Sequence, residues 1–303
     1  MQNRMLSLAA VVSLCAGSLA SADRKLAELV MPEPKLLAGL NMDRVKSTAT
    51  GRFVLKQIAE RTKQLQSMTS YYGVDATRIQ ELVIASTSMS PADGGLALVR
   101  AKFNAAEIRN RAARQGAIEE TYGNTTILEN SSQTMALAFF GKDIAAAGDV
   151  ASVKGAIDRN AGSPALPQPL VDEVGRWSST EDIWAISTNP EAALAAATKL
   201  AVPPGMLSRM RDAAGGLKLL PKSAVLTAQA QTDAPETAAA LGMALKMLAT
   251  MAQKTAEKNG TPPAIPMPTV GSEGPMLKVS ANLSDVELRT LLAPQQVKTA
   301  KKK

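Results

Sequence analysis

The sequence predicts an α+β fold with a mainly antiparallel sheet and with helices packed on one face of that sheet. The first observation is that apolar residues occupy every second position of two strand-like runs, 224–231 and 277–283, and that polar residues occupy all but one of the positions between them. This alternation is typical of an antiparallel strand with one buried and one wet face, whereas strands of a parallel sheet are nearly continuous apolar runs. The second observation is that a helix-start signal directly follows four strand-like runs.

That helix-start signal is a capping box. The cap side chain accepts a hydrogen bond from the first free N–H groups of the helix, and a glutamate three residues later reaches back to the cap's own N–H. The four pairs are Asn104 and Glu107, Thr188 and Glu191, Asp233 and Glu236, and Ser284 and Glu287.

The first half of the chain, about 33–162, reads as an alternation of strands and helices. A strand at 34–42 leads into a helix over roughly 50–69, and strands at 81–88 and 95–103 form a pair across a Pro-Gly turn. A helix at 104–115 is followed by strands at 117–122, 125–129, 133–141 and 143–149, and Asp149 caps a helix that ends near Gly162.

The second half, about 170–294, repeats the theme with strands near 182–187, 224–232 and 276–283 and a long helix at 234–259. Three prolines make 163–169 the predicted linker, and the Pro-rich segment 261–275 is predicted to be a surface loop. The similar halves suggest duplication. Two separate domains and one continuous sheet both stay open at this stage.

The segments YGNTTI (122–127) and DVASVKGAID (149–158) resemble uncharacterised secreted bacterial α+β proteins of unknown function. The resemblance covers roughly residues 90–160. It implies an exported α+β architecture, and it implies no activity and no functional residue.

The N-terminus has the pattern of a secretory signal peptide. Arg4 precedes an apolar run over 5–20, and Ala20-Ser21-Ala22 matches a small-residue cleavage site. Cleavage after Ala22 predicts a periplasmic or secreted protein. It also removes Cys15, the single cysteine of the chain.

The composition excludes large classes of chemistry. The chain has no histidine, and without Cys15 it has no thiol, so neither a Ser-His-Asp triad nor a histidine- or cysteine-held zinc site can form. No catalytic residue, metal site or cofactor is therefore assigned, and a non-catalytic binding or structural protein is favoured. The alternative is a hydrolase that uses carboxylate, Lys or Tyr chemistry. One neighbourhood combines acids with aromatics, although a core role for its tryptophans is favoured: Trp177 and Trp184, with Asp172, Glu173, Glu181 and Asp182.

Two surfaces are candidates for binding. The first is the polar face of the two alternating strands, with Thr227, Gln229, Gln231, Lys278, Ser280 and Asn282. The second is the flank of the long helix that carries Met243, Met247 and Met251, which is expected to pack against another element or a partner. Because thioethers bind Cu(I), copper binding by these methionines is a further alternative.

The expected partner is an envelope or secreted protein. The formal net charge is +7, and four of those charges are lysines in the basic tail 295–303, at positions 298, 301, 302 and 303. A disordered end is the favoured role for this tail, and contact with an anionic membrane is the less favoured one. No nucleic-acid partner is expected, because no aromatic residue accompanies the lysines to stack on bases.

Overall fold

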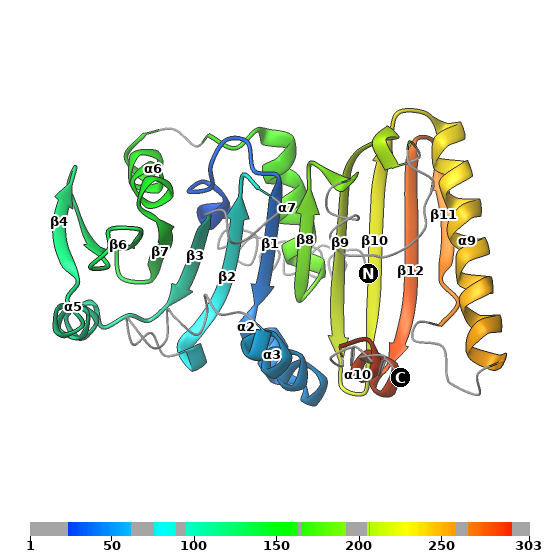
Figure 1. Ribbon diagram of the computed structural model, residues 1–303, viewed down its shortest axis with the longest axis horizontal. Coiled ribbons are helices and arrows are strands. Elements are labelled where there is room, and N and C mark those ends of the chain that lie inside the picture. The colour runs from blue at the N-terminus through cyan, green and yellow to red at the C-terminus, as the bar shows by residue number, and fades with distance from the viewer. Residues whose placement is uncertain are drawn as a thin grey trace, which may run out of the picture.

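In the computed structural model, twelve strands form one antiparallel sheet that runs the length of the molecule (Figure 1). The structure describes residues 24–61, 76–88, 95–162, 165–191, 205, 207–258 and 266–292. The strand order is β11-β12-β10-β9-β8-β1-β2-β3-β7-β6-β5-β4, and every neighbouring pair is antiparallel. The predicted α+β class with a mainly antiparallel sheet is confirmed. The predicted signal peptide and basic tail lie outside the described residues.

The strands are β1 (Leu36–Asn41), β2 (Ile79–Ser86), β3 (Leu96–Ala101), β4 (Ile118–Tyr122), β5 (Thr125–Glu129), β6 (Met135–Phe140), β7 (Ile144–Asp149), β8 (Ile183–Ser187), β9 (Met210–Leu220), β10 (Ser223–Thr232), β11 (Thr269–Glu273) and β12 (Met276–Ser284). The helices are α2 (Met42–Ser47), α3 (Ala49–Arg61), α5 (Ala105–Arg114), α6 (Val150–Ala161), α7 (Gln168–Thr180), α9 (Pro235–Lys258) and α10 (Asp285–Leu292), with short 3-10 turns at Ala76–Arg78 and Leu207–Arg209.

Helices pack on both faces of the sheet, which corrects the expectation of a single covered face. Leu98 and Val99 are neighbours on β3 and point to opposite faces of the sheet, yet both are buried. Both faces are therefore covered at this strand. Leu98 packs in the core beneath α6 and α7, whereas Val99 packs in the core beneath α2 and α5. The expectation holds locally in β10 and β12, where one side of each strand is apolar and faces α9 or α10.

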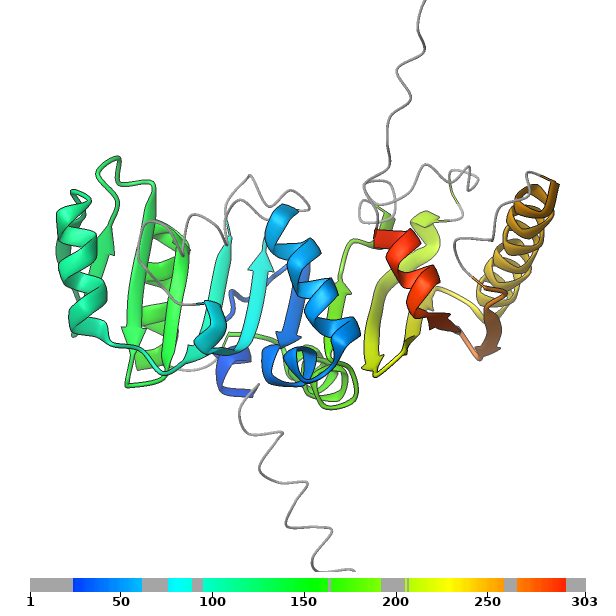
Figure 2. The same cartoon turned by 90° about the horizontal axis from the view of Figure 1, so that it is seen from below.

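The second core surface continues toward the C-terminal end of the sheet. Val45 and Val54, from α2 and α3, pack with Leu288 of α10 over β9, β10 and β12. The two helices α3 and α10 lie side by side although they are far apart in the sequence (Figures 1 and 2). Further along, Leu241 of α9 packs on Val270 and Leu277 of β11 and β12.

Strand β1 joins the two predicted halves by pairing with β2 on one side and β8 on the other. Gly39 faces Trp184 across this seam, and a side chain at position 39 would overlap the indole ring. Trp184 and Trp177 are buried, so the predicted core role of both tryptophans is confirmed. The strands of both predicted halves thus belong to one sheet, while their proposed origin by duplication stays a prediction.

The predicted caps have mixed outcomes. Ser284 and Glu287 form the reciprocal box, with N–H to side-chain distances of 2.7 and 3.3 Å, and Asn104 accepts from the N–H of Glu107 at 3.3 Å. The other two differ because the cap side chains bond to groups other than the helix N–H groups. Asp233 accepts from Arg209 and from Thr237, and the hydroxyl of Thr188 donates to the carbonyl of Pro34.

Two strands were not predicted. Strand β11 lies inside the segment 261–275 that was expected to be a loop, and it forms an edge of the sheet by pairing with β12. Strand β9 contains Gly215 and Gly216, which have low strand propensity, but it is held between β8 and β10. In addition, α7 begins at Gln168, within the predicted linker 163–169.

Candidate ligand-binding cleft

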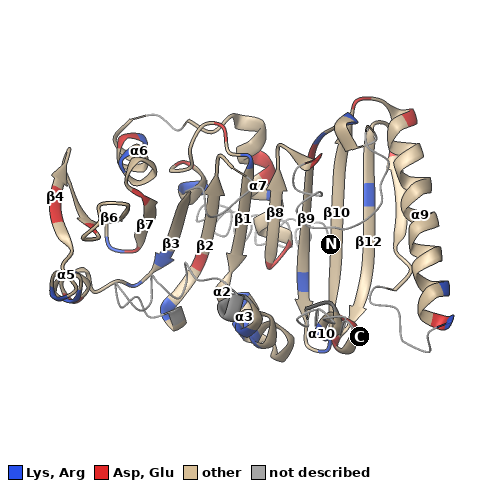
Figure 3. Cartoon of the chain, in the orientation of Figure 1, with Lys and Arg blue, Asp and Glu red and all other residues tan. Residues whose placement is uncertain are grey.

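The six polar residues predicted on β10 and β12 lie on one face of the sheet. Strand register places Gln229 opposite Lys278, Thr227 opposite Ser280, and Gln231 opposite Met276. Asn282 shares this face because it lies opposite Val225. Lys278 and Asn282 are exposed, and the other four are partly exposed. Strand β10 carries no charged residue, so this part of the face is polar but neutral (Figure 3).

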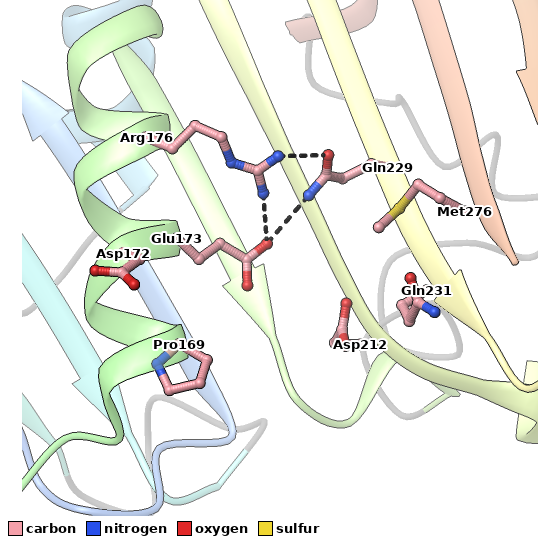
Figure 4. A pocket seen from close by; sticks show the side chains of 8 residues that line it. All are labelled: Pro169, Asp172, Glu173, Arg176, Asp212, Gln229, Gln231 and Met276. Carbon is pink, nitrogen blue, oxygen red and sulfur yellow. Dashed lines mark hydrogen bonds and ion pairs between the residues drawn. The ribbon is translucent and has the colours of Figure 1, made fainter. Parts of the chain in front are cut away.

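Helix α7 borders this open face. It begins with a proline in its first turn, and its buried residues Val174 and Trp177 pack on the sheet over β1, β8 and β9. Glu173 and Arg176, one turn apart on the helix, point toward β10 (Figure 4). A cleft of about 390 Å³ lies between the helix and the sheet, a volume in the range of small-molecule sites. Its lining residues are Pro169, Asp172, Glu173, Arg176, Asp212, Gln229, Gln231 and Met276.

A hydrogen-bond network ties one wall of the cleft to the other (Figure 4). Oε1 of Glu173 accepts from Arg176 at 3.3 Å, from Nε2 of Gln229 at 3.2 Å and from the indole N–H of Trp177 at 3.4 Å. Arg176 also donates to Oε1 of Gln229 at 3.1 Å. Because Trp177 is buried in the core, this network fixes Glu173 and Gln229 relative to the sheet.

Asp212 of β9 lies opposite Gln231 on the same face. Burial raises the pKa of its carboxyl group, and the nearby charge of Glu173 raises it further. The backbone N–H of Gln231, and Arg176 and Arg211 from a longer distance, act in the opposite direction without cancelling these effects. The charged form of Asp212 is therefore disfavoured in the cleft, and a further positive charge nearby would stabilise it.

A second buried acid, Glu181, lies beyond the C-terminal end of α7. It is 7% exposed, it leans on Gly216 of β9, and its Oε2 has no hydrogen-bond partner among the described residues. Burial raises the pKa of this carboxyl group, Asp182 raises it further, and Lys218 and Arg44 lower it. The charged form therefore carries a free-energy cost in the folded protein.

Replacement of this acid by its neutral isostere, Glu181→Gln, is expected to stabilise the fold at neutral pH. A raised folded-state pKa means that both states are protonated at low pH and that stability is lost as pH rises above the ordinary carboxyl range. The variant should gain about 1 kcal/mol at pH 7 and nothing at pH 4, as measured by chemical denaturation. An equal gain at both pH values would contradict this account.

Lys154 and Tyr122 each contact a carboxylate at the β4 end of the sheet. Lys154 of α6 contacts both oxygens of Glu120 at 3.0 Å, and this hydrogen bond raises the pKa of the lysine. The hydroxyl of Tyr122 donates to Asp158 at 3.1 Å, which raises the pKa of the phenol. Both groups are therefore held in their protonated forms at neutral pH.

The methionines of α9 are exposed. Met243, Met247 and Met251 are 71%, 62% and 59% exposed, on the side of the helix away from the buried Leu241 and Gly242. The described residues of the chain do not cover this flank, so the expected contact with a second element of the chain is absent there. The predicted contact with a partner stays a prediction, as does copper binding.

Sequence reasoning identified part of the cleft. Gln229 and Gln231 line it, while Thr227, Lys278, Ser280 and Asn282 lie on the same open face outside it. Asp172 and Glu173, noted for their closeness to Trp177, form the helical wall. Four lining residues were missed: Pro169, Arg176, Asp212 and Met276. The alternation of β10 indicated the face, but no local signal placed β9 and α7 beside it.

Comparisons with known proteins support the fold. Three crystal forms of TP0453, a treponemal protein, match with a TM-score of 0.55 each and sequence identities of 10%, 11% and 8%. The matches cover 88% of this chain and 96–97% of TP0453. No protein-family model matches the sequence, and no curated protein does. Within the described ranges, we find no helix with the length and hydropathy of a transmembrane span. The chain therefore shares an overall architecture with a bacterial protein at very low sequence identity.

Proposed function

We propose that this protein is an exported, non-catalytic binding protein that holds its ligand between α7 and the open face of β9, β10 and β12. The observation that carries the proposal is the cleft of about 390 Å³ at the border between the covered and the uncovered parts of one sheet face. Under α7 this face is apolar, with Trp184 and Ile186 in the core. Beyond β9 it is polar, so it favours contact with water or with a polar ligand.

The fixed geometry of the cleft also supports a binding role. The side chain of Gln229 is held at both ends, since its oxygen accepts from Arg176 and its nitrogen donates to Glu173. A binding site whose side chains are already ordered loses less conformational entropy when the ligand binds. Export to the periplasm or outside the cell, and an envelope or secreted partner, are parts of the same proposal that rest on the predicted signal peptide.

A thermal-unfolding screen of the purified protein tests the binding role. The panel contains small amines, carboxylates, neutral sugars and dipeptides. A ligand present at 100 times its dissociation constant stabilises the folded state by about 2.7 kcal/mol, which is readily measured. We expect at least one class to raise Tm. We expect the variant Gln231→Leu to remove that shift, while Glu119→Gln, on the exposed side of β4 at the far end of the sheet, leaves it unchanged. A panel in which no class raises Tm would overturn the proposal.

A second candidate function, carboxylate-based hydrolysis of a glycosidic bond, is favoured by one specific observation. The cleft holds two carboxyl groups in different environments: Asp212 has a raised pKa, and Glu173 is ion-paired with Arg176. Such a division is what a general acid and its partner carboxylate require. Asp212 would donate a proton to the leaving oxygen. Glu173 would act as the nucleophile or the general base on the opposite side of the sugar.

Nitrophenyl glycosides offered at pH 4–7 distinguish the two functions. Hydrolysis that is lost in both Asp212→Asn and Glu173→Gln would establish the enzyme. Binding without turnover would support the non-catalytic function.

A further inference from the structure

We propose that the cleft between α7 and β10 binds a primary ammonium group on a short apolar chain, and that Asp212 and Gln231 hold the ammonium. This inference rests on the proposed binding function and names the chemical class of the ligand. The same chemistry occurs in a free alkyl diamine and in a lysine side chain of a protein.

The charge of the cleft favours a cation. Its lining residues carry three carboxylates and one guanidinium. Glu173 and Arg176 neutralise each other through their ion pair at 3.3 Å. Asp172 lies at the exposed end of the helical wall and accepts from Gln168 at 2.7 Å. Asp212 is left as the half-buried carboxylate on the sheet side, and a ligand cation would supply the charge partner that it lacks.

The hydrogen-bonding groups beside Asp212 fit an ammonium group. Gln231 is its direct neighbour across the β9–β10 register, so the two side chains emerge side by side on the open face (Figure 4). The side chain of Gln229 is already occupied by Arg176 and Glu173, whereas that of Gln231 has no such contact within the described part of the chain. An ammonium group can donate to the carboxylate of Asp212 and to the amide oxygen of Gln231 at the same time.

The apolar lining fits a short hydrocarbon chain. Met276 follows Gln231 in the same cross-strand row, and Pro169 faces the sheet from the first turn of α7 (Figure 4). Met276 is partly buried, and its flexible thioether adapts to a methylene chain. A carboxylate ligand would instead meet Asp212 and Asp172, and a neutral sugar would leave the charge of Asp212 without a partner.

The cations on the elements around Asp212 do not form an ion pair with it among the described residues, so the cleft still favours a cationic ligand. Arg176 of α7 is held by Glu173, and Arg211 on the same strand as Asp212 is exposed. On the far side, Lys278 of β12 is paired with Glu273 of β11 at 2.6 Å. Arg176 and Lys278 thus each have an acid of their own, and Lys218, on the same face opposite Val225, lies six residues along β9 from Asp212.

Titration calorimetry at low ionic strength tests the inference with four probes: 1,4-diaminobutane, Nα-acetyl-lysine amide, neutral 1,4-butanediol and anionic succinate. We expect at least one amine to bind and the diol and succinate not to bind. The variant Asp212→Asn should weaken amine binding at least about tenfold, because a charge-assisted hydrogen bond is lost. Gln231→Leu should weaken it by a smaller factor. Glu119→Gln, a charge-matched change on β4, should leave it within about twofold.

The pH dependence of amine binding distinguishes direct contact with Asp212 from a purely structural role of this residue. Binding of a cation to ionised Asp212 should weaken several-fold between pH 7 and pH 4, and Asp212→Asn should lose this dependence. Binding of the diamine alone identifies a free amine as the ligand type, and binding of the lysine amide alone identifies a protein side chain. Binding of the diol or succinate in place of the amines, or unchanged amine binding by a folded Asp212→Asn protein, overturns the inference but leaves the binding function standing. Absence of binding by all four probes, together with a negative thermal screen, overturns both.

Discussion

A single methyl group at position 39 is expected to destabilise the protein by about 2–3 kcal/mol, because Gly39→Ala overpacks the centre of the sheet. Gly39 lies opposite Trp184 in the β1–β8 ladder, and the added carbon would overlap the indole ring. Trp184 is 3% exposed and is packed beneath α7, so it cannot move aside without opening the core. Thermal unfolding should show a loss of roughly 5–10 °C in Tm.

The matched control is a glycine with free space around it. Gly175 in α7 has no atom near the position of an added carbon. Because alanine has a higher helix propensity than glycine, Gly175→Ala should raise stability by about 0.5–1 kcal/mol. If both glycine variants changed stability by the same amount and in the same direction, overlap with Trp184 would not be the cause at position 39.

Removal of the buried carboxylate of Asp182 should cost about 3 kcal/mol. In the variant Asp182→Ala, two groups lose their partner. The N–H of Leu219 donates to Oδ2 of Asp182 at 2.7 Å, and Nε of Arg44 lies 3.2 Å from Oδ1 at an angle outside hydrogen-bond geometry, so that contact is an ion pair. Asp182 is 6% exposed, and water cannot replace it at low cost.

The conservative variant separates the hydrogen bond from the charge. Asp182→Asn keeps an oxygen that can accept from Leu219 and loses the ion pair, so we expect about half of the loss seen with alanine. Urea unfolding of both variants measures the difference. Equal losses would show that the charge of Asp182, rather than its hydrogen bond, holds β8 against β9 and α2.

Arg44 also connects this region to the C-terminal end of α7. Its guanidinium donates to the carbonyl oxygens of Ser179 at 3.1 Å and Glu181 at 2.7 Å, at the C-terminal end of α7. A cation at this end of a helix interacts favourably with the unpaired carbonyl groups. Arg44 therefore links α2 on one face of the sheet to the helix that forms a wall of the cleft on the other.

Local sequence signals were sufficient for most elements. The cap at Asp149 and the end near Gly162 predicted α6, and the predicted range 234–259 matches α9 closely. The turn at Gly123 predicted the β4–β5 hairpin. These features depend on residues within a few positions of one another, which a sequence shows directly.

Features that depend on distant partners were not predicted. Strand β9 contains two glycines and is defined by its neighbours β8 and β10. Strand β11 follows prolines and is defined by β12. The cleft requires α7, β9, β10 and β12 to meet, and these elements span more than 100 positions of the chain. The exposed methionines of α9 illustrate the same limit, since helical spacing fixes their common direction but not what lies beyond them.

The position of β1 also sets a condition on the order of folding events. Its second partner, β8, begins more than 140 residues after β1 ends. Until β8 has been synthesised, β1 is an open edge, and unpaired strand edges are templates for wrong pairing. Closing so long a loop is slow. Folding intermediates of this protein should therefore present the β1 edge, which β8 covers in the native sheet, until the second half of the chain has been synthesised and has folded.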